Sequence, residues 1–176
     1  MKKLFPLFTA ISLLLLSFNS IAQKNEDKSK RPSPPAFVKE TNPLGALLSI
    51  DYSQPSVKGR TIGKDLEPKN GEIWRTGANE ATIFETTKEV KINGQVLPAG
   101  KYSLFTISGD EEWSIIFNKT WKQWGAYSYK QSDDALRIKV KPIKSEIFSE
   151  KLLFTIEKNG TVTLLWGDVK VSFVAE

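Results

Sequence analysis

Apolar and polar residues alternate with a period of two over much of the chain from Leu44 onward. Residues 136–141 show this clearly, because three aliphatic side chains alternate there with three basic ones. Successive side chains of a β-strand point to opposite faces, so this segment is expected to bury one face and expose the other. The pattern predicts strands rather than helices.

The same criterion predicts further short strands separated by turns. The pairs Asn93-Gly94 and Asn159-Gly160 suit tight hairpin turns, because both residue types adopt positive φ readily. Ser108-Gly109-Asp110 indicates another turn. The apolar residues of 151–157 and 161–166 are expected to face the same side. Strands are expected near residues 47–52, 82–86, 89–92, 102–107, 113–118, 126–129, 136–140, 151–157, 161–166 and 170–174.

About ten short strands without an amphipathic helix predict an all-β fold. We expect a single domain, a β-sandwich or jelly-roll-like barrel of mostly antiparallel strands, over residues 37–176. Residues 23–36 are polar and contain three closely spaced prolines. Because that composition buries little apolar surface, it predicts a flexible linker.

The first 22 residues have the pattern of a secretory signal peptide. Two lysines precede an apolar run over residues 4–18, and small residues stand three and one positions before a cleavage point after Ala22. The alternative is a membrane anchor, but a spanning helix needs about 20 apolar residues. We therefore expect a periplasmic or secreted protein with no stable membrane anchor after cleavage.

The formal charge of +5 is concentrated near the N-terminus. Six of the 25 basic residues and two of the 20 acidic ones precede Phe37, which leaves 19 basic against 18 acidic residues in the predicted domain. A nearly neutral domain lacks the basic footprint that phosphate backbones require. Nucleic acid is not expected as a partner.

The composition excludes several kinds of chemistry. The chain has no histidine and no cysteine, so it has no Ser-His-Asp or Cys-His system and none of the usual zinc or iron sites. Glycine-rich nucleotide-binding loops are also missing. Calcium could bind the acidic runs 110–112 and 133–134, but neither has the spacing of a calcium loop, which favours solvated turns. We expect neither a metal nor an organic cofactor.

Two polar segments are candidates for a binding site. Residues 74–82, with the sequence WRTGANEAT, gather an arginine, an asparagine and a glutamate around small residues, and residues 52–60 hold a second arginine. Arginine suits bidentate capture of anionic groups. We therefore hypothesise that both arginines converge on a small anionic, polar or glycan-like ligand. The predicted ligand-binding residues are Arg60, Arg75, Asn79 and Glu80, with Lys58, Tyr52 and Trp74 as secondary candidates.

A structural role for the same residues stays open. Arg75 would pair with Glu80 or Glu72 inside the fold, and Asn79 would bond its own backbone. Among the tryptophans, Trp113 and Trp166 occupy strand positions on the apolar face and are expected in the core. The remaining candidates, Trp121 and Trp124, are expected on an exposed loop, where indoles can stack on sugar rings.

Two other function classes remain as alternatives to a binding module. A histidine-free hydrolase or lyase would use Glu80 as acid or base, paired with Glu72 or Asp51. A structural module of the cell envelope would instead bind another protein through an exposed apolar patch. The sequence does not determine the oligomeric state.

Four segments together resemble the family catalogued as domain of unknown function 2911. They are PSVKGR at 55–60, WRTGANEAT at 74–82, LPAGKYSLF at 97–105 and WSIIFN at 113–118. The resemblance runs from about Pro34 to Val174. It implies an exported bacterial protein, and it assigns no catalytic residue.

Overall fold

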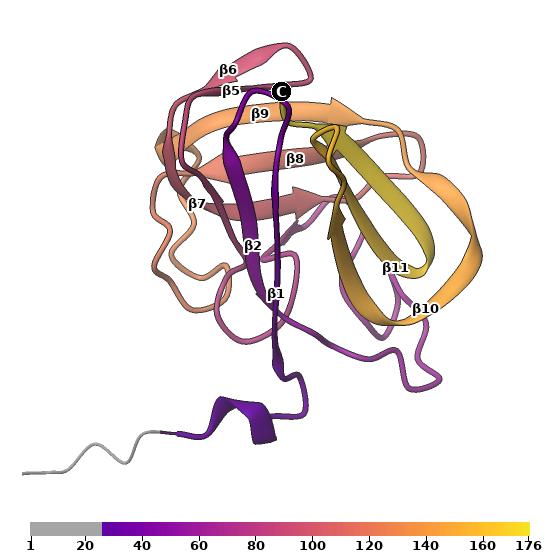
Figure 1. The fold of residues 1–176 in the computed structure, drawn as a ribbon. Coiled ribbons are helices and arrows are strands. Elements are labelled where there is room, and N and C mark those ends of the chain that lie inside the picture. Colours follow the sequence, from indigo (N-terminus) through magenta and orange to yellow (C-terminus); the bar gives the residue numbers. More distant parts are fainter. Residues whose placement is uncertain (1–25) are drawn as a thin grey trace, which may run out of the picture.

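The computed structural model of the protein describes residues 26–176, so the predicted signal peptide lies outside the described residues. Residues 26–176 form eleven strands and two short 3-10 helices, η1 (Lys28–Lys30) and η2 (Gln131–Asp133). All the paired strands are antiparallel. The predicted all-β sandwich class is confirmed (Figure 1). In this described range, no helix has both the length and the apolar character needed to cross a membrane.

The larger sheet forms one curved layer of the sandwich. Its strand order is β1-β2-β4-β7-β8-β9, and β3 pairs with the end of β7. The strands are β1 (Pro35–Thr41), β2 (Leu47–Ser53), β3 (Ile73–Trp74), β4 (Ile83–Thr86), β7 (Gly100–Ile107), β8 (Trp113–Asn118) and β9 (Asp134–Val140).

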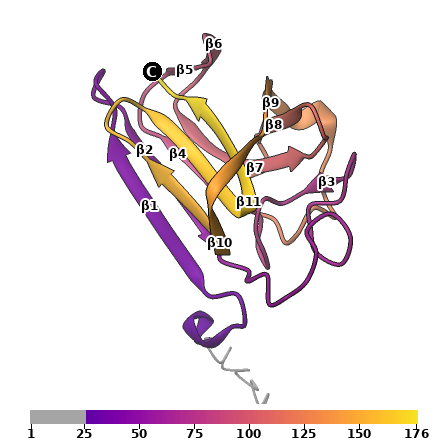
Figure 2. The ribbon, with the colours of Figure 1, turned by 90° about the vertical axis from the view of Figure 1, so that its right-hand side faces the viewer.

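The second layer consists of β10 (Ile143–Ile156) and β11 (Thr161–Val174), which lie across the inner face of the larger sheet (Figure 2). β11 folds back on itself, because Thr163 Oγ1 lies 2.9 Å from Ser172 Oγ within this one element. Gly167, with φ 61, stands at the turn. The two strands predicted over 161–166 and 170–174 correspond to the two limbs of this hairpin, visible as the returning yellow ribbon in Figure 1.

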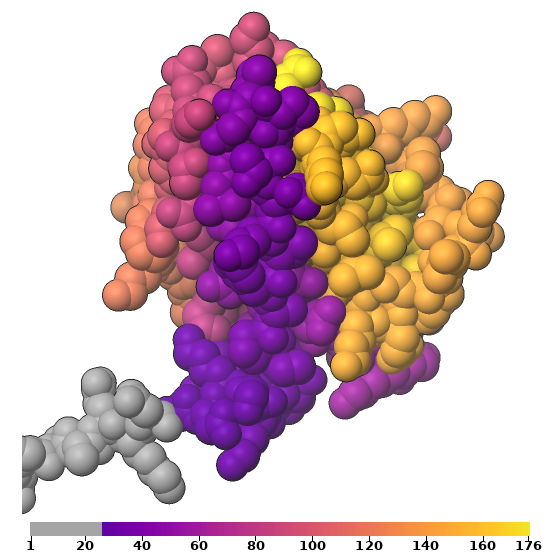
Figure 3. Space-filling view, in the orientation of Figure 1, coloured from indigo at the N-terminus to yellow at the C-terminus, as the bar shows by residue number. Residues whose placement is uncertain are grey.

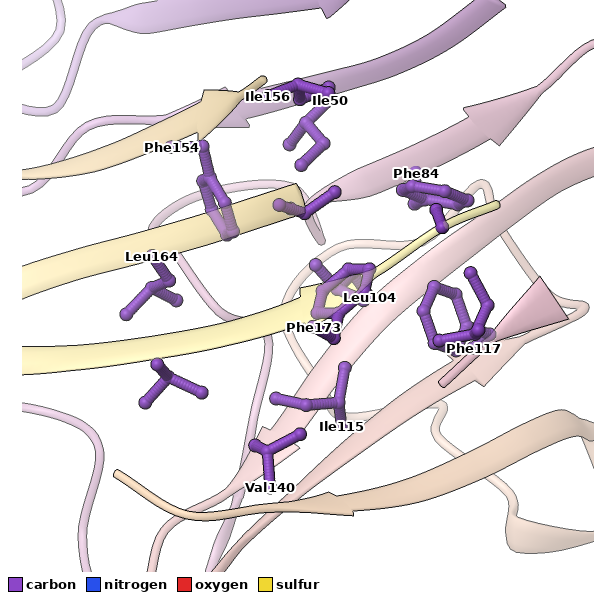
Figure 4. Packing of buried hydrophobic residues seen from close by; sticks show 14 of the residues in the cluster. Ile50, Phe84, Leu104, Ile115, Phe117, Val140, Phe154, Ile156, Leu164 and Phe173 are labelled. Atoms are coloured by element: carbon purple, nitrogen blue, oxygen red, sulfur yellow. The ribbon is translucent and has the colours of Figure 1, made fainter. Parts of the chain in front are cut away.

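Aromatic side chains from both layers meet in the core (Figure 4). Phe117 of β8 makes edge-on contacts with Phe84 of β4 and Phe173 of β11, with ring centroids 5.2 and 5.6 Å apart. Tyr52 of β2 packs edge-on against Phe154 of β10 at 5.0 Å. Such pairs add stabilisation beyond the area that they bury. The core therefore joins the layers directly.

The predicted alternation and turns are confirmed in detail. Ile138 and Val140 are buried while Lys139 is exposed. Asn93 and Gly94 both have positive φ and form the two-residue turn between β5 (Val90–Ile92) and β6 (Gln95–Leu97). Asn159-Gly160 lies in the turn between β10 and β11. On those two strands, the predicted inward residues Leu152, Phe154, Ile156, Val162, Leu164 and Trp166 are all buried.

Several segments differ from the expected strands, and β3 and β6 lie outside every expected range. The strand predicted at 126–129 is wrong, because these residues form a turn whose Ala126 and Tyr129 pack on Phe105 and Ile116, outside the main core. Conversely, β1 starts at Pro35, inside the segment 23–36 that was expected to be a linker. Its sequence does not alternate, because Ala36, Phe37 and Val38 are all apolar, and it begins with a proline, which an edge strand tolerates at its first residue.

Candidate functional site

Residues 74–82, here called the Arg75 loop, lead from β3 towards β4 and are anchored in the core. Trp74 is only 2% exposed and its indole N–H donates to the Gly77 carbonyl at 3.1 Å. Thr76 is fully buried, and its φ of 53° is unusual for a β-branched residue. The Thr82 hydroxyl donates to the Thr76 carbonyl at 2.8 Å. Many of the loop's polar groups therefore bond to other groups of the same loop and fix its conformation. The positive φ of Thr76 is a strained backbone conformation.

Residues 119–130, here called the aromatic loop, lie along the Arg75 loop. Ala81 N–H donates to the Gln123 carbonyl and Gly125 N–H donates to the Asn79 carbonyl, each at 3.0 Å. The loop exposes Trp121, Trp124 and Tyr127, the last with 86% of its surface accessible. The predicted exposure of Trp121 and Trp124 is confirmed, as is the burial of Trp113 and Trp166.

A polar network fixes the end of the aromatic loop. Tyr129 donates from its hydroxyl to Asp134 at 3.0 Å and accepts from Arg137 at 2.7 Å. Arg137 also pairs with Asp134, and the Asn118 side chain donates to the same carboxylate. Burial and donation to Asp134 raise the pKa of Tyr129 to about 12. Asp134 thus has a structural role, and within the described chain no three acidic residues gather as a metal site would require.

Arg75 is half-buried and lies beneath the aromatic loop, with Nη1 beside Gly125. Its Nε is buried without an acceptor, and the side-chain oxygen of Gln123 is likewise buried without a donor. Residues 26–176 contain no ion pair or side-chain hydrogen bond of Arg75. The internal pair with Glu80 or Glu72 that the sequence left open is not formed within this range.

Glu80 instead binds two cations from residues 26–34, here called the strap. Its Oε1 accepts from Lys28 Nζ at 2.8 Å and its Oε2 accepts from Arg31 Nη1 at 2.7 Å. Partial burial would raise the pKa of this carboxyl, but the hydrogen bonds from Lys28 and Arg31 outweigh that effect and lower it to about 2. Glu80 is therefore ionised at any ordinary pH.

Further contacts hold the strap against the domain. The Arg31 guanidinium lies 5.6 Å from the ring centroid of Trp124 and is also paired with Glu26 at 2.6 Å. Asn79, in the left-handed region with φ 59°, donates from its side chain to the Ser33 carbonyl at 3.0 Å. In Figure 3 the indigo strap continues the domain surface at the lower end of β1.

A hollow of about 120 Å³ lies beside these contacts. Burial raises the pKa of Asp51, one of its two carboxylates, whereas the other, Glu80, is strongly acidic. The two carboxyl groups therefore line the same hollow, and their pKa values are shifted in opposite directions. Its lining residues are Lys28, Arg31, Pro35, Asp51, Tyr52, Ser53, Glu80, Ala81 and Ile83.

The remaining predicted residues lie elsewhere or in the core. The Arg60 guanidinium donates to the Ser56 and Val57 carbonyls of its own loop. Lys58, with φ 48°, is exposed, and its backbone N–H donates to Glu150. Tyr52 is 5% exposed and its hydroxyl accepts from the Phe154 N–H. The structure brings Asn79 and Glu80 together at the strap, and it gives Arg60 no partner in common with Arg75 among residues 26–176.

Sequence reasoning missed the two strap cations. Lys28 and Arg31 lie in the polar segment that was expected to be a linker, and no periodic pattern marks them. The clue that the sequence did offer was two basic residues three positions apart in a chain whose WRTGANEAT motif carries an acidic residue. Composition alone cannot pair segments that lie 49 positions apart.

Comparisons with known proteins extend the resemblance seen in the sequence. A family model described as a protein of unknown function, DUF2911, matches residues 33–174. No curated protein and no solved structure matches the chain. The matched range begins in the strap, includes all eleven strands and ends with β11. The chain therefore belongs to the DUF2911 family.

Proposed function

We propose that the protein is an exported binding module, and that Arg75 is the anchor for a small anionic or hydroxyl-rich ligand. The observation that carries this proposal is a half-buried arginine without an acceptor in the described residues. A buried charged donor without a partner is costly, and native proteins rarely retain one without a role or a bound water. A carboxylate, sulfate or hydroxyl group supplies the missing acceptor.

The surroundings of Arg75 favour a glycan-like ligand with acidic or hydroxyl groups. Gln123 lacks a donor for its buried oxygen, and a hydroxyl group can donate as well as accept. Trp121, Trp124 and Tyr127 expose ring surface on the loop above, and aromatic faces with one polar edge suit sugar rings. An acidic sugar would combine all three kinds of contact.

Ligand-induced changes in melting temperature test this proposal. The parent and Arg75→Ala are heated with a library of uronic acids, neutral sugars and small organic acids. A ligand present at 100 times its dissociation constant stabilises the native state by about 2.7 kcal/mol. We expect at least one acidic member of the library to raise the melting temperature of the parent and not that of Arg75→Ala.

Arg60→Ala is the matched control, because the Arg60 guanidinium is already bonded to carbonyls of its own loop. It should keep the full ligand response. A library that shifts neither the parent nor the control, or that shifts Arg75→Ala equally, contradicts a role of Arg75 in binding and leaves a bound water as the partner of its Nε.

A second candidate function is a histidine-free hydrolase that uses Asp51 and Glu80. The supporting observation is that two carboxyl groups line one hollow with pKa shifts of opposite direction, and known hydrolases work with such pairs of carboxyl groups. Lys28 and Arg31 would have to leave Glu80 first. Release of nitrophenol from aryl glycosides that is lost in both Asp51→Asn and Glu80→Gln would support it, whereas the same release by either variant contradicts it.

A further inference from the structure

The strap is bound in the way that a peptide ligand is bound. Arg31 keeps only 11% of its side chain exposed, whereas the neighbouring Lys30 keeps 82%. The burial of Arg31 is therefore specific to this side chain, because the neighbouring Lys30 stays in solvent. Glu26 of the strap binds two nitrogens of the Arg31 guanidinium, and the domain binds the third through Glu80.

The domain surface recognises three different features of the strap. Glu80 uses one carboxylate oxygen for Arg31 and the other for Lys28. The Trp124 ring lies against the Arg31 guanidinium, a contact in which the electron-rich ring face attracts a cation. Asn79 bonds the main-chain carbonyl of Ser33. Three contacts to side chains and one to the backbone together specify a short basic peptide.

We propose that Asn79, Glu80 and Trp124 form a recognition site for arginine-bearing basic peptides, which the strap occupies in cis. The ligand has the strap's own pattern, a lysine and an arginine three positions apart followed by an accessible backbone carbonyl two positions later. Exposed ion pairs are individually weak, so the strap is retained mainly because the chain keeps it close to the site. A second peptide of the same chemistry competes with it.

This site shares Trp124 with the proposed Arg75 site, but it binds a ligand of opposite charge. Arg75 contributes no hydrogen bond to the strap among the described residues, and the charges that bind the strap come from Glu80. An anion that binds Arg75 and a cation that binds Glu80 are ligands of opposite sign. The two proposals are therefore tested by probes of opposite charge.

Peptide binding in trans tests the inference. The probe is a fluorescent, end-blocked peptide with the sequence of residues 28–33, KSKRPS, and its anisotropy is measured with the signal-free chain. In the variant Lys28→Ala/Arg31→Ala, Glu80 and Trp124 are freed of the strap cations, while the contact of Asn79 with the Ser33 carbonyl is kept. We expect this variant to bind the probe roughly tenfold or more tightly than the parent, because competition in cis is removed.

Adding Glu80→Gln to the double variant should weaken probe binding by about tenfold or more, because the charge-assisted hydrogen bonds are lost. A probe with citrulline in place of arginine, which keeps the shape and removes the charge, should also bind weakly. Lys139→Ala in the double variant, which breaks the separate pair with Glu112, should leave binding unchanged. A single cooperative melting transition shows that each variant is folded.

Equal binding by the parent and the double variant overturns the proposal, as does binding that Glu80→Gln leaves intact. Absence of binding by the double variant also overturns it, and the strap is then only a structural part of this domain. None of these results bears on the response to anionic ligands through Arg75.

Discussion

Arg31 Nη1 donates to Glu80 Oε2 at 2.7 Å across 49 positions of the chain. This bond joins the first described segment of the chain to the Arg75 loop, and Trp124 of the aromatic loop covers the same guanidinium. Three segments that are far apart in sequence thus meet at the ion pair between Arg31 and Glu80. The charge of Glu80 consequently supplies both ion pairs between the strap and the Arg75 loop.

We predict that the strap is released by acid in the pH range set by Glu80. Its folded pKa is lowered from 4.5 to about 2, so the stabilisation is fully present above pH 4.5 and is lost as the pH falls towards 2. NMR titration of the Glu80 carboxyl should report the low pKa in the parent and a value closer to 4.5 in Arg31→Ala. Lys139→Ala, which breaks the separate pair with Glu112, should not change it. An ordinary pKa in the parent contradicts the ion pairs.

Tyr129→Phe should destabilise the fold by about 1 kcal/mol at neutral pH, the net contribution of one hydrogen bond. Arg137 and Asp134 still contact each other at 3.0 Å in that variant, which limits the loss. Because the folded pKa of Tyr129 is raised to about 12, its contribution is present below pH 10 and is lost as the pH rises towards 12. Denaturant unfolding of both proteins at several pH values measures this. A difference that persists unchanged at pH 12 argues against the bond to Asp134.

Gly160→Ala should be much more damaging than Gly94→Ala, although both glycines have positive φ in hairpin turns. The strain of positive φ costs each variant about 1–2 kcal/mol. A Cβ at Gly160 would also collide with the Ala175 carbonyl oxygen, whereas one at Gly94 would meet open space. We expect a further loss of about 1–3 kcal/mol for Gly160→Ala from overpacking. Chemical denaturation compares the two, and equal losses would contradict the close approach of the β10–β11 turn to the C-terminus.

Phe117→Ala should lower the free energy of unfolding by about 3–5 kcal/mol, as expected for a fully buried aromatic. Phe117 is inaccessible and contacts aromatic rings from both layers. Phe37→Ala provides the control, since Phe37 on the edge strand β1 is 59% exposed and should cost no more than about 0.5 kcal/mol. Similar losses in the two variants would be inconsistent with the described core.

Much of the fold was predictable from local pattern. Alternation marked Ile138 and Val140 as buried and Lys139 as exposed, because a strand has only two faces and one of them must leave water. The Asn93-Gly94 pair located a two-residue turn, because few other residues adopt positive φ at both positions. The WRTGANEAT motif drew attention to Asn79 and Glu80 because of its residue types.

What Asn79 and Glu80 contact was decided only by the tertiary structure. Period and propensity describe how a segment presents its own side chains, and they carry no information about which distant segment will lie opposite. β1 forms a strand because it pairs along its full length with β2. Residues 126–129 form a turn in which Ala126 and Tyr129 pack on Phe105 and Ile116. Lys28 and Arg31 reach Glu80 for the same reason. The folded chain brings this carboxylate and the basic segment within bonding distance, where their opposite charges attract.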